Sequence, residues 1–171
     1  MIRVARDGFR EVTPDTTASF HIRPATEADA SALLAIYRPF VETTTVSFET
    51  VAPTIDEFAA RIAKAIAGWQ WLVAERDGRC VGYAYGGLHR ERAAYRWSAE
   101  VSAYVHPSFH RQGVGRALYM KLLDELAQKG YCSAYAGITL PNDGSVALHR
   151  SVGFESIGFE SRIPYPRTQT L

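Results

Sequence analysis

A glycine pair at the start of a helix-like segment constrains this chain more than any other feature. The stretch HPSFHRQGVGRALY, residues 106–119, joins an alternating, strand-like run to a helix-like run. Glycine within a helical pattern costs roughly 1 kcal/mol relative to alanine. Gly113 and Gly115 therefore indicate that something approaches the backbone closely at this turn.

A glycine-rich turn between a strand and a helix is typical of anion binding, because free N–H groups and the helix dipole meet there. This turn lacks the Gly-Lys-Ser/Thr ending of a P-loop, and it is not a G-x-G-x-x-G placed after a first strand. We therefore favour an anion site outside the two common nucleotide-binding motifs. A tight packing turn between helix and strand is the alternative.

Composition narrows the class of protein. A chain of 171 residues predicts one domain, and 47% hydrophobic residues are enough for a core. The net charge of +1 argues against a protein whose main function is to bind the phosphates of nucleic acids. The two cysteines form no disulfide framework and favour a cytoplasmic location. We find no run of about 18 apolar residues, so we expect no membrane span, and we expect no secretory leader.

The pattern along the chain predicts alternating strands and helices. Residues 1–20 are weakly patterned, and we leave them out of the fold as a lead-in that could be disordered. Residues 21–171 then form a single domain. The expected strands are 20–25, two strands within 69–88 around Asp77-Gly78, 97–105, 131–140 and 154–161, and the expected helices are 26–42, 53–66, 114–129 and 142–152.

This order, β-α-α-β-β-β-α-β-α-β, predicts an α/β (α+β) fold. The three middle strands can form an antiparallel meander, and the strand–helix–strand unit after residue 97 can form a parallel crossover. A mixed, largely antiparallel sheet with helices on both faces follows.

The stretch YVHPSFHRQGVGRALY resembles motif A of the GNAT superfamily of acetyl-CoA-dependent N-acetyltransferases. The resemblance runs over about residues 21–158 and includes IRPATEADA, WSAEVSAYVHP and LPNDGSVALHRSVGFE. Within the superfamily the chain is most similar to phosphinothricin and methionine sulfoximine N-acetyltransferases. The resemblance implies acetyl transfer to the amine of a small amino-acid-like substrate, a homodimer and a GNAT-like fold.

The resemblance also implies where acetyl-CoA binds. The backbone of one strand end would line the pantetheine arm, the glycine turn would hold the pyrophosphate, and an asparagine beyond the next strand would contact the cofactor. His110 occupies the usual Gln/Arg position of the motif, but the anion contacts there are mostly backbone ones. The implied cofactor-binding residues are Ala103, Tyr104, Val105, Arg111, Gln112, Gly113, Val114, Gly115, Arg116 and Asn142.

Acetyl transfer to an amine requires a base, because a primary amine has a pKa of about 10 and must lose a proton to attack. Glu100 is our candidate. It lies mid-strand on the polar face of residues 97–105 and matches the glutamate of the family's W-x-A-E. The alternative is a solvated glutamate on an exposed sheet face. Ser102 shares that face and could hold the substrate or a bridging water, or it is a surface serine.

His149 falls where many GNAT enzymes place a tyrosine near the sulfur. An imidazole there could protonate the departing thiolate. A lone histidine on a short helix is also a common structural residue, and this alternative stays open.

The connection 89–97, HRERAAYRW, matches a substrate-contacting stretch of the family. Arg90, Arg92 and Arg96 could bind a carboxylate bidentately, and a solvated hairpin loop is the alternative. The positions that the resemblance assigns to substrate contact are Arg90, Glu91 and Arg92. The segment TTTVSFE would form the opposite wall, where Phe48 could line the site or belong to the core. Tyr83 carries the same ambiguity.

The end of the chain departs from the family. Relatives continue after the Gly-Phe strand with a Gly-Arg-Trp-x-Asp-like segment, and ESRIPYPRTQTL, from about residue 160, does not match it. An exposed edge, a strand donated by a partner and an impaired enzyme are three possible consequences. A frameshift or truncation in the encoding sequence would explain the difference. Cys80 and Cys132 have no paired histidine, so we predict no thiol nucleophile and no metal.

Other functions remain open. The acceptor could be another amine, such as a peptide N-terminus or a polyamine. The chain could bind acyl-CoA with little catalysis, or it could bind the phosphates of a nucleotide.

Overall fold

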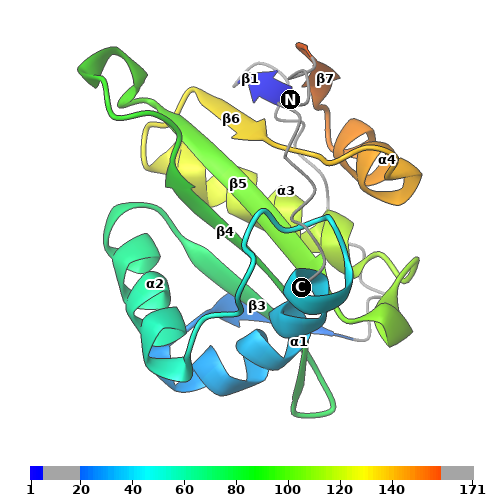
Figure 1. Ribbon diagram of the computed structural model, residues 1–171. Helices are drawn as coiled ribbons and strands as arrows, with labels where there is room; N and C mark the ends of the chain where they lie inside the picture. Colours follow the sequence, from blue (N-terminus) through cyan, green and yellow to red (C-terminus); the bar gives the residue numbers. More distant parts are fainter. Residues whose placement is uncertain (6–19, 159–171) are drawn as a thin grey trace, which may run out of the picture.

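The computed structural model describes residues 1–5 and 20–158, which form one mixed sheet between helices (Figure 1). Four α-helices and three short 3-10 helices accompany seven strands in this part of the chain. The strands are β1 Ile2–Ala5, β2 His21–Pro24, β3 Trp71–Arg76, β4 Arg79–Leu88, β5 Ser98–Val105, β6 Ser133–Ala136 and β7 Glu155–Ser156. The helices are α1 Ala30–Thr43, α2 Ile55–Gly68, α3 Val114–Gln128 and α4 Asp143–Ser151, with η2 Glu27–Asp29, η3 Ala93–Tyr95 and η4 Pro107–Phe109.

The sheet has the order β2-β3-β4-β5-β6-β1-β7. β3, β4 and β5 form the predicted antiparallel meander, and β5, α3 and β6 form the predicted parallel crossover. The expected fold class is therefore confirmed. None of the described helices is both long and apolar enough to cross a bilayer.

The two faces of the sheet carry separate cores. α1 and α2 cover one face, and α3 covers the other (Figure 1). The alternation of β5 divides between them: Ala99 and Val101 pack towards α3, whereas Tyr104 packs towards α1. Odd and even residues of β5 thus serve different layers, as the period of a strand requires.

Short-range features of the structure form at the positions that the sequence predicts. Thr54 and Glu57 make a reciprocal capping box at the start of α2. Asp77 and Gly78 both have positive φ, of 50° and 72°, in the tight turn between β3 and β4. The 3-10 helix η2 follows Thr26 and leads directly into α1.

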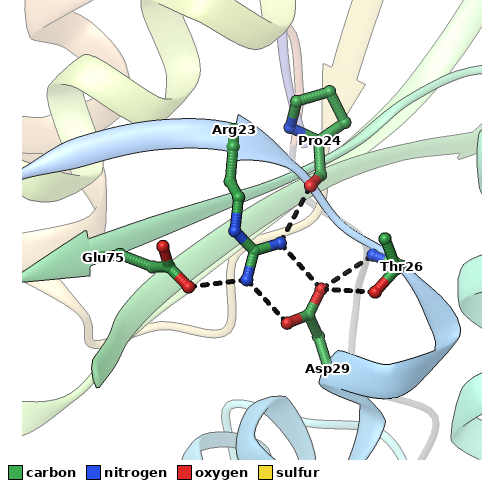
Figure 2. A network of polar contacts seen from close by, with 5 residues as sticks. All are labelled: Arg23, Pro24, Thr26, Asp29 and Glu75. Atoms are coloured by element: carbon green, nitrogen blue, oxygen red, sulfur yellow. Dashed lines mark hydrogen bonds and ion pairs between the residues drawn. The ribbon is translucent and has the colours of Figure 1, made fainter. Parts of the chain in front are cut away.

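An arginine ties the edge strand to the neighbouring elements (Figure 2). Arg23 of β2 donates to both carboxylate oxygens of Asp29, at 2.7 and 2.8 Å, and to Glu75 Oε1 at 2.6 Å. Asp29 Oδ2 also accepts from the backbone N–H of Thr26 at 2.7 Å. Arg23 is the main reason why the pKa of Asp29 falls to about 2.

The treatment of residues 1–20 as a segment outside the fold is wrong for residues 2–5. β1 pairs antiparallel with β6, from Ile2 opposite Ala136 to Ala5 opposite Ser133, and its other side pairs with β7. Val4 is 2% exposed in the α3-side core. β6 therefore lies inside the described sheet, between β5 and β1. The atypical C-terminal segment from about residue 160, and the consequences expected of it, lie outside the described residues. Residues 6–19 lie outside the described residues.

Two strands are shorter than predicted. β6 covers 133–136 of the expected 131–140, and β7 covers 155–156 of the expected 154–161, of which 159–161 lie outside the described residues. Phe48 is 84% exposed, so it does not belong to the core, whereas Tyr83 is fully buried there.

Candidate active site

An opening between β5 and β6 forms the centre of the candidate site. The two strands pair in parallel only over Ser98–Glu100, opposite Ser133–Tyr135, among the described residues. Residues 101–105 of β5 remain paired with β4 but run beyond the last pair with β6. Figure 1 shows the two strands diverging from this point. On the β6 side, the backbone of Ala103 and the N–H of Val105 are therefore available to a bound chain, whereas the groups of Tyr104 face β4.

The turn that follows β5 is held by its own side chains. His110 Nε2 lies 2.9 Å from the carbonyl oxygen of Val105, so the ring closes the turn back onto the strand end. Gln112 accepts from Arg76 Nη1 at 2.9 Å and donates to the carbonyl of Ser108 at 2.9 Å. The backbone of Arg111 has a positive φ of 59°. The turn is therefore held by side-chain hydrogen bonds although His110 replaces the Gln or Arg that is usual at this position of the motif.

The two glycines of the turn have different physical causes. Gly113 caps α3 with φ 80°, and a Cβ placed there would meet nothing within 4 Å, so its requirement is conformational. Gly115 has no such φ, but a Cβ there would lie 3.0 Å from Leu148 Cδ2 of α4, so its requirement is close packing. The close contact at Gly115 supports the interpretation as a packing turn, and an anion site at this turn stays a prediction.

The start of α3 offers amide groups to an anion. The first bond of the helix runs from Ala117 N to Gly113 O at 3.0 Å. The N–H groups of Val114, Gly115 and Arg116 precede it and have no carbonyl within the helix to bond. A helix of 15 residues also directs the positive end of its dipole at this turn.

Asn142 begins α4 beyond β6. Its side-chain oxygen accepts from the backbone N–H of Ser145 at 3.1 Å, which makes it the N-cap of the helix. The side-chain amide nitrogen is a donor that this cap does not use. Contact between Asn142 and a cofactor stays a prediction.

Glu100 lies on the α1/α2 face of β5, at the last residue that pairs with β6. Its side chain is 52% exposed. Gly87 of β4 stands opposite it on one side and Tyr135 of β6 on the other, and the lack of a side chain at Gly87 leaves the carboxylate accessible from the β4 side. Ser102 follows on the same face, opposite Tyr85. Burial raises the pKa of Tyr85, and a hydrogen bond with Ser102 opposes that rise.

A pocket of about 210 Å³ opens on this same face, between α2 and the end of β4. Aromatic side chains form its floor, and two cations of α2 stand at its wall. Its β4 end is one strand away from Glu100, since Gly87 lines the pocket and pairs with Glu100. The residues lining it include Tyr37, Phe58, Arg61, Lys64, Trp71, Tyr83 and Tyr85. Sequence patterning had placed these aromatics in strands and helices without bringing them to one site.

The predicted substrate loop follows β4 directly. Arg90, Glu91 and Arg92 are all exposed, and Arg92 precedes the 3-10 helix η3. The guanidinium of Arg90 lies 5.3 Å from the ring centre of Tyr95, within cation–π distance. The loop thus presents fixed positive charge beside the strand that carries Glu100.

His149, the candidate proton donor to the thiolate, has a buried side chain. It is 5% exposed, between α3 and α4, and its Nδ1 lies 2.7 Å from the carbonyl of Ser145. Nδ1 must therefore be protonated, and Nε2 accepts from the Tyr119 hydroxyl at 2.8 Å. Burial lowers the pKa of His149, which favours the neutral ring. Since both nitrogens are engaged within the protein, the structure favours the alternative of a structural histidine.

One group of described residues has the ligand types of a metal site. Asp29, Glu75 and Cys80 bring their ligand atoms within 4.8 Å of one another. However, Arg23 already binds both carboxylates (Figure 2), and burial raises the pKa of the Cys80 thiol, which disfavours the thiolate. This group therefore fits an internal ion pair better than a metal ion.

Two features beside Glu100 were not singled out from the sequence. His89 and Tyr135 stack face to face next to its carboxylate. Strand alternation alone puts His89 on the Glu100 face, but only the β5–β6 register brings Tyr135 there.

Comparisons with known proteins identify the family. The model of the acetyltransferase (GNAT) family matches residues 33–154. A phosphinothricin N-acetyltransferase of Streptomyces viridochromogenes is 40% identical over 137 residues, which cover 80% of this chain and 75% of that protein. An L-methionine sulfoximine/L-methionine sulfone acetyltransferase of Salmonella typhimurium is 36% identical over 134 residues, 78% of each chain.

A solved structure agrees with these relatives. The phosphinothricin acetyltransferase of Sinorhizobium meliloti, in complex with acetyl-CoA, superposes with a TM-score of 0.78 at 33% identity, covering 82% of this chain and 77% of that one. The chain therefore belongs to the GNAT family of acetyltransferases, enzymes that use acetyl-CoA as the acyl donor.

Proposed function

We propose that this protein transfers the acetyl group of acetyl-CoA to the α-amino group of a small amino-acid-like substrate, with Glu100 as the general base. The observation that carries the proposal is the position of Glu100. It is the last residue of β5 paired with β6, so its carboxylate stands at the head of the opening in which the donor would lie. Phosphinothricin-like and methionine sulfoximine-like compounds are the first candidates, as the relatives' names suggest.

The donor would lie along residues 103–105 with its pyrophosphate on the turn 111–116. The strand end offers backbone groups on its β6 side, and the turn offers the amides at the start of α3. Asn142 would contact the donor from the opposite side of the opening. Binding of this kind uses backbone groups, which agrees with the tolerance of the turn for His110.

The reaction requires two protons to leave the nitrogen of the ammonium substrate, one before the attack and one after it. The ammonium form of the substrate gives its proton to Glu100, directly or through a water, and the neutral nitrogen attacks the thioester carbonyl carbon. The nitrogen of the tetrahedral intermediate then loses its second proton to solvent as the intermediate expels CoA by breaking the carbon–sulfur bond, and the thiolate takes a proton from solvent. A positioned base contributes typically about 10²–10⁴-fold to such a step. Because His149 is buried and engaged, we assign it to the packing of α3 on α4.

The substrate would bind between the 89–97 loop and the aromatic pocket. Arg90 and Arg92 are the candidate partners of its carboxylate, Glu91 lies between them, and Ser102 could bind the substrate beside Glu100. Acetylation of another amine, such as a polyamine, is the second candidate, and acyl-CoA binding with little turnover is the third.

The test is the release of CoA from acetyl-CoA with phosphinothricin, methionine sulfoximine and an amine panel that includes a polyamine. Turnover on the amino acid analogues that falls at least 100-fold in Glu100→Gln, with acetyl-CoA still raising the melting temperature, would support the proposal. Preference for a polyamine would change the substrate class. Binding of acetyl-CoA without turnover on any amine would leave a binding protein.

We also propose a cytoplasmic homodimer. Both cysteines are free, and two large apolar side chains at the β4–β5 connection, Leu88 and Trp97, are 52% and 50% exposed. Sedimentation analysis of the wild type and of Trp97→Ser would test the assembly, and a monomer at micromolar concentration in the wild type would exclude it.

A further inference from the structure

A histidine whose side chain is nearly inaccessible to solvent stands next to the proposed base. The His89 side chain is 3% exposed, and its Nδ1 lies 4.0 Å from Glu100 Oε2. Nδ1 is buried and has no hydrogen-bond partner among the described residues. Buried polar atoms are rarely left unpaired in proteins, so an orphan beside a carboxylate calls for an explanation.

The ring of His89 is held in place by aromatic contacts. Its plane lies on the Tyr135 ring of β6, with ring centres 3.9 Å apart and planes 7° apart, and Tyr95 packs edge-on at 5.7 Å. Tyr135 is also the register partner of Glu100. The stack therefore holds the imidazole beside the Glu100 carboxylate, with Nδ1 facing that carboxylate.

We propose that His89 is a positioning residue for the base: its Nδ1–H donates to Glu100 Oε2, holds that carboxylate at the opening and favours its ionised form. The proposal rests on the proposed role of Glu100. An approach of about 1 Å would bring the two atoms into hydrogen-bond distance. A rotation of the exposed Glu100 side chain supplies such a movement without displacing the stacked ring.

The surroundings favour a neutral imidazole in this role. Burial, followed by the positive charge of Arg90, lowers the pKa of His89. The other titratable or charged groups around the ring are Glu100 on β5, Tyr135 on β6, Tyr95 in the following loop and Arg3, which stands opposite Tyr135 in β1. A neutral ring has one N–H, and a carboxylate beside Nδ1 favours the proton on that nitrogen.

The kinetic test uses two substitutions that separate the nitrogen from the ring. His89→Phe keeps an aromatic ring on Tyr135 and removes the donor, whereas His89→Asn places an amide nitrogen near the position of Nδ1 and removes the ring. We expect His89→Phe to move the acidic limb of the kcat/KM profile upwards by about 0.5–1 pH unit, because an ionised carboxylate loses a donor. His89→Asn should recover at least half of that shift. The same exchange on the exposed edge strand, His21→Phe, is the control and should leave the limb in place.

A merely structural His89 would lower activity without moving the limb, and an unmoved limb in His89→Phe would overturn the proposal. Should His89→Phe fail to fold, ¹⁵N NMR of the histidine side chains in the unmodified protein gives an independent answer. A proton on Nδ1 of His89 near pH 7.5 is expected, and the Nε2-protonated tautomer would overturn the proposal. Glu100→Gln separates the failure of this proposal from the failure of the proposed function. If this variant retains full activity, Glu100 is not the base, whatever the result for His89.

Discussion

Replacing Gly113 by alanine should cost stability through backbone conformation alone. The residue has φ 80° and ψ −9°, and a Cβ there would meet nothing within 4 Å. No steric clash therefore contributes. An L-residue in the left-handed region costs about 1–2 kcal/mol, and the reduced freedom of the unfolded chain returns about 0.4–1 kcal/mol. We expect a net loss of about 1 kcal/mol, or about 2–4 °C in Tm for a chain of this size.

Urea unfolding of three variants isolates this cause. Gly113→Asn should lose about half as much as Gly113→Ala, because asparagine tolerates the left-handed region. Gly144→Ala is the matched control: Gly144 lies in α4 with open space around it and no positive φ, so alanine there should be neutral or stabilising by up to about 1 kcal/mol. A Gly113→Ala protein as stable as the wild type would refute the reasoning.

The same variant reports on the anion site. If alanine makes the turn relax towards negative φ, the amides at the start of α3 rotate away from a bound pyrophosphate. The rise in Tm produced by acetyl-CoA should then shrink in Gly113→Ala and remain unchanged in Gly144→Ala. An equal response to acetyl-CoA in both would mean that the turn packs the helix without binding the donor.

Three further predictions concern the scaffold. Arg23→Met should cost about 1–2 kcal/mol. Since Asp29 has a pKa of about 2 in the fold against 3.8 ordinarily, the wild type should also lose stability as pH falls from about 4 to 2, and the variant should lose less over that window in acid unfolding. Burial lowers the pKa of His149 in the fold, so the unfolded chain binds the proton more tightly. The stability of the wild type should therefore fall as the pH drops below about 6.5. A plot of Tm against pH should be flatter for His149→Gln than for the wild type. Val4→Ala should lower the free energy of unfolding in urea by about 1–3 kcal/mol, because Val4 is 2% exposed. Arg3→Ser, at an exposed position of the same strand, is the control and should change it little. Equal free energies of unfolding for the two variants would mean that β1 does not pack on the sheet.

The parts of the fold that the sequence predicts are those encoded within a few residues. The capping box at Thr54 and Glu57, the Asp77-Gly78 turn and the alternation of 97–105 each depend on neighbours in the chain, and all three are confirmed. The parts it does not predict depend on distant partners. Residues 2–5 have too short a pattern to indicate a strand, and only pairing with β6 and β7 makes them one.

The same distinction applies to the site. Glu100 could be placed on the polar face of its strand from alternation, and the glycine turn from its spacing. His149 could not, because a helical histidine points either to a site or into a core according to the rotation of the helix. Here α4 turns it towards Tyr119, and its two hydrogen bonds complete an internal network. His89 was equally hidden, since the stack beneath it comes from Tyr135, 46 positions further along the chain.

The geometry of β5 itself discriminates between the remaining donors. Glu100 and Val105 are five residues apart on one strand, which corresponds to about 17 Å at about 3.3 Å per residue. A ligand that is held by its phosphates at the turn must therefore extend back along the strand to reach the base. A long pantetheine arm with backbone partners along residues 103–105 satisfies this requirement, whereas a nucleotide triphosphate gathered at the turn leaves the carboxylate out of reach. Acetyl-CoA should accordingly raise Tm far more than ATP at equal concentration, and equal protection by the two ligands would show that the turn recognises phosphate alone.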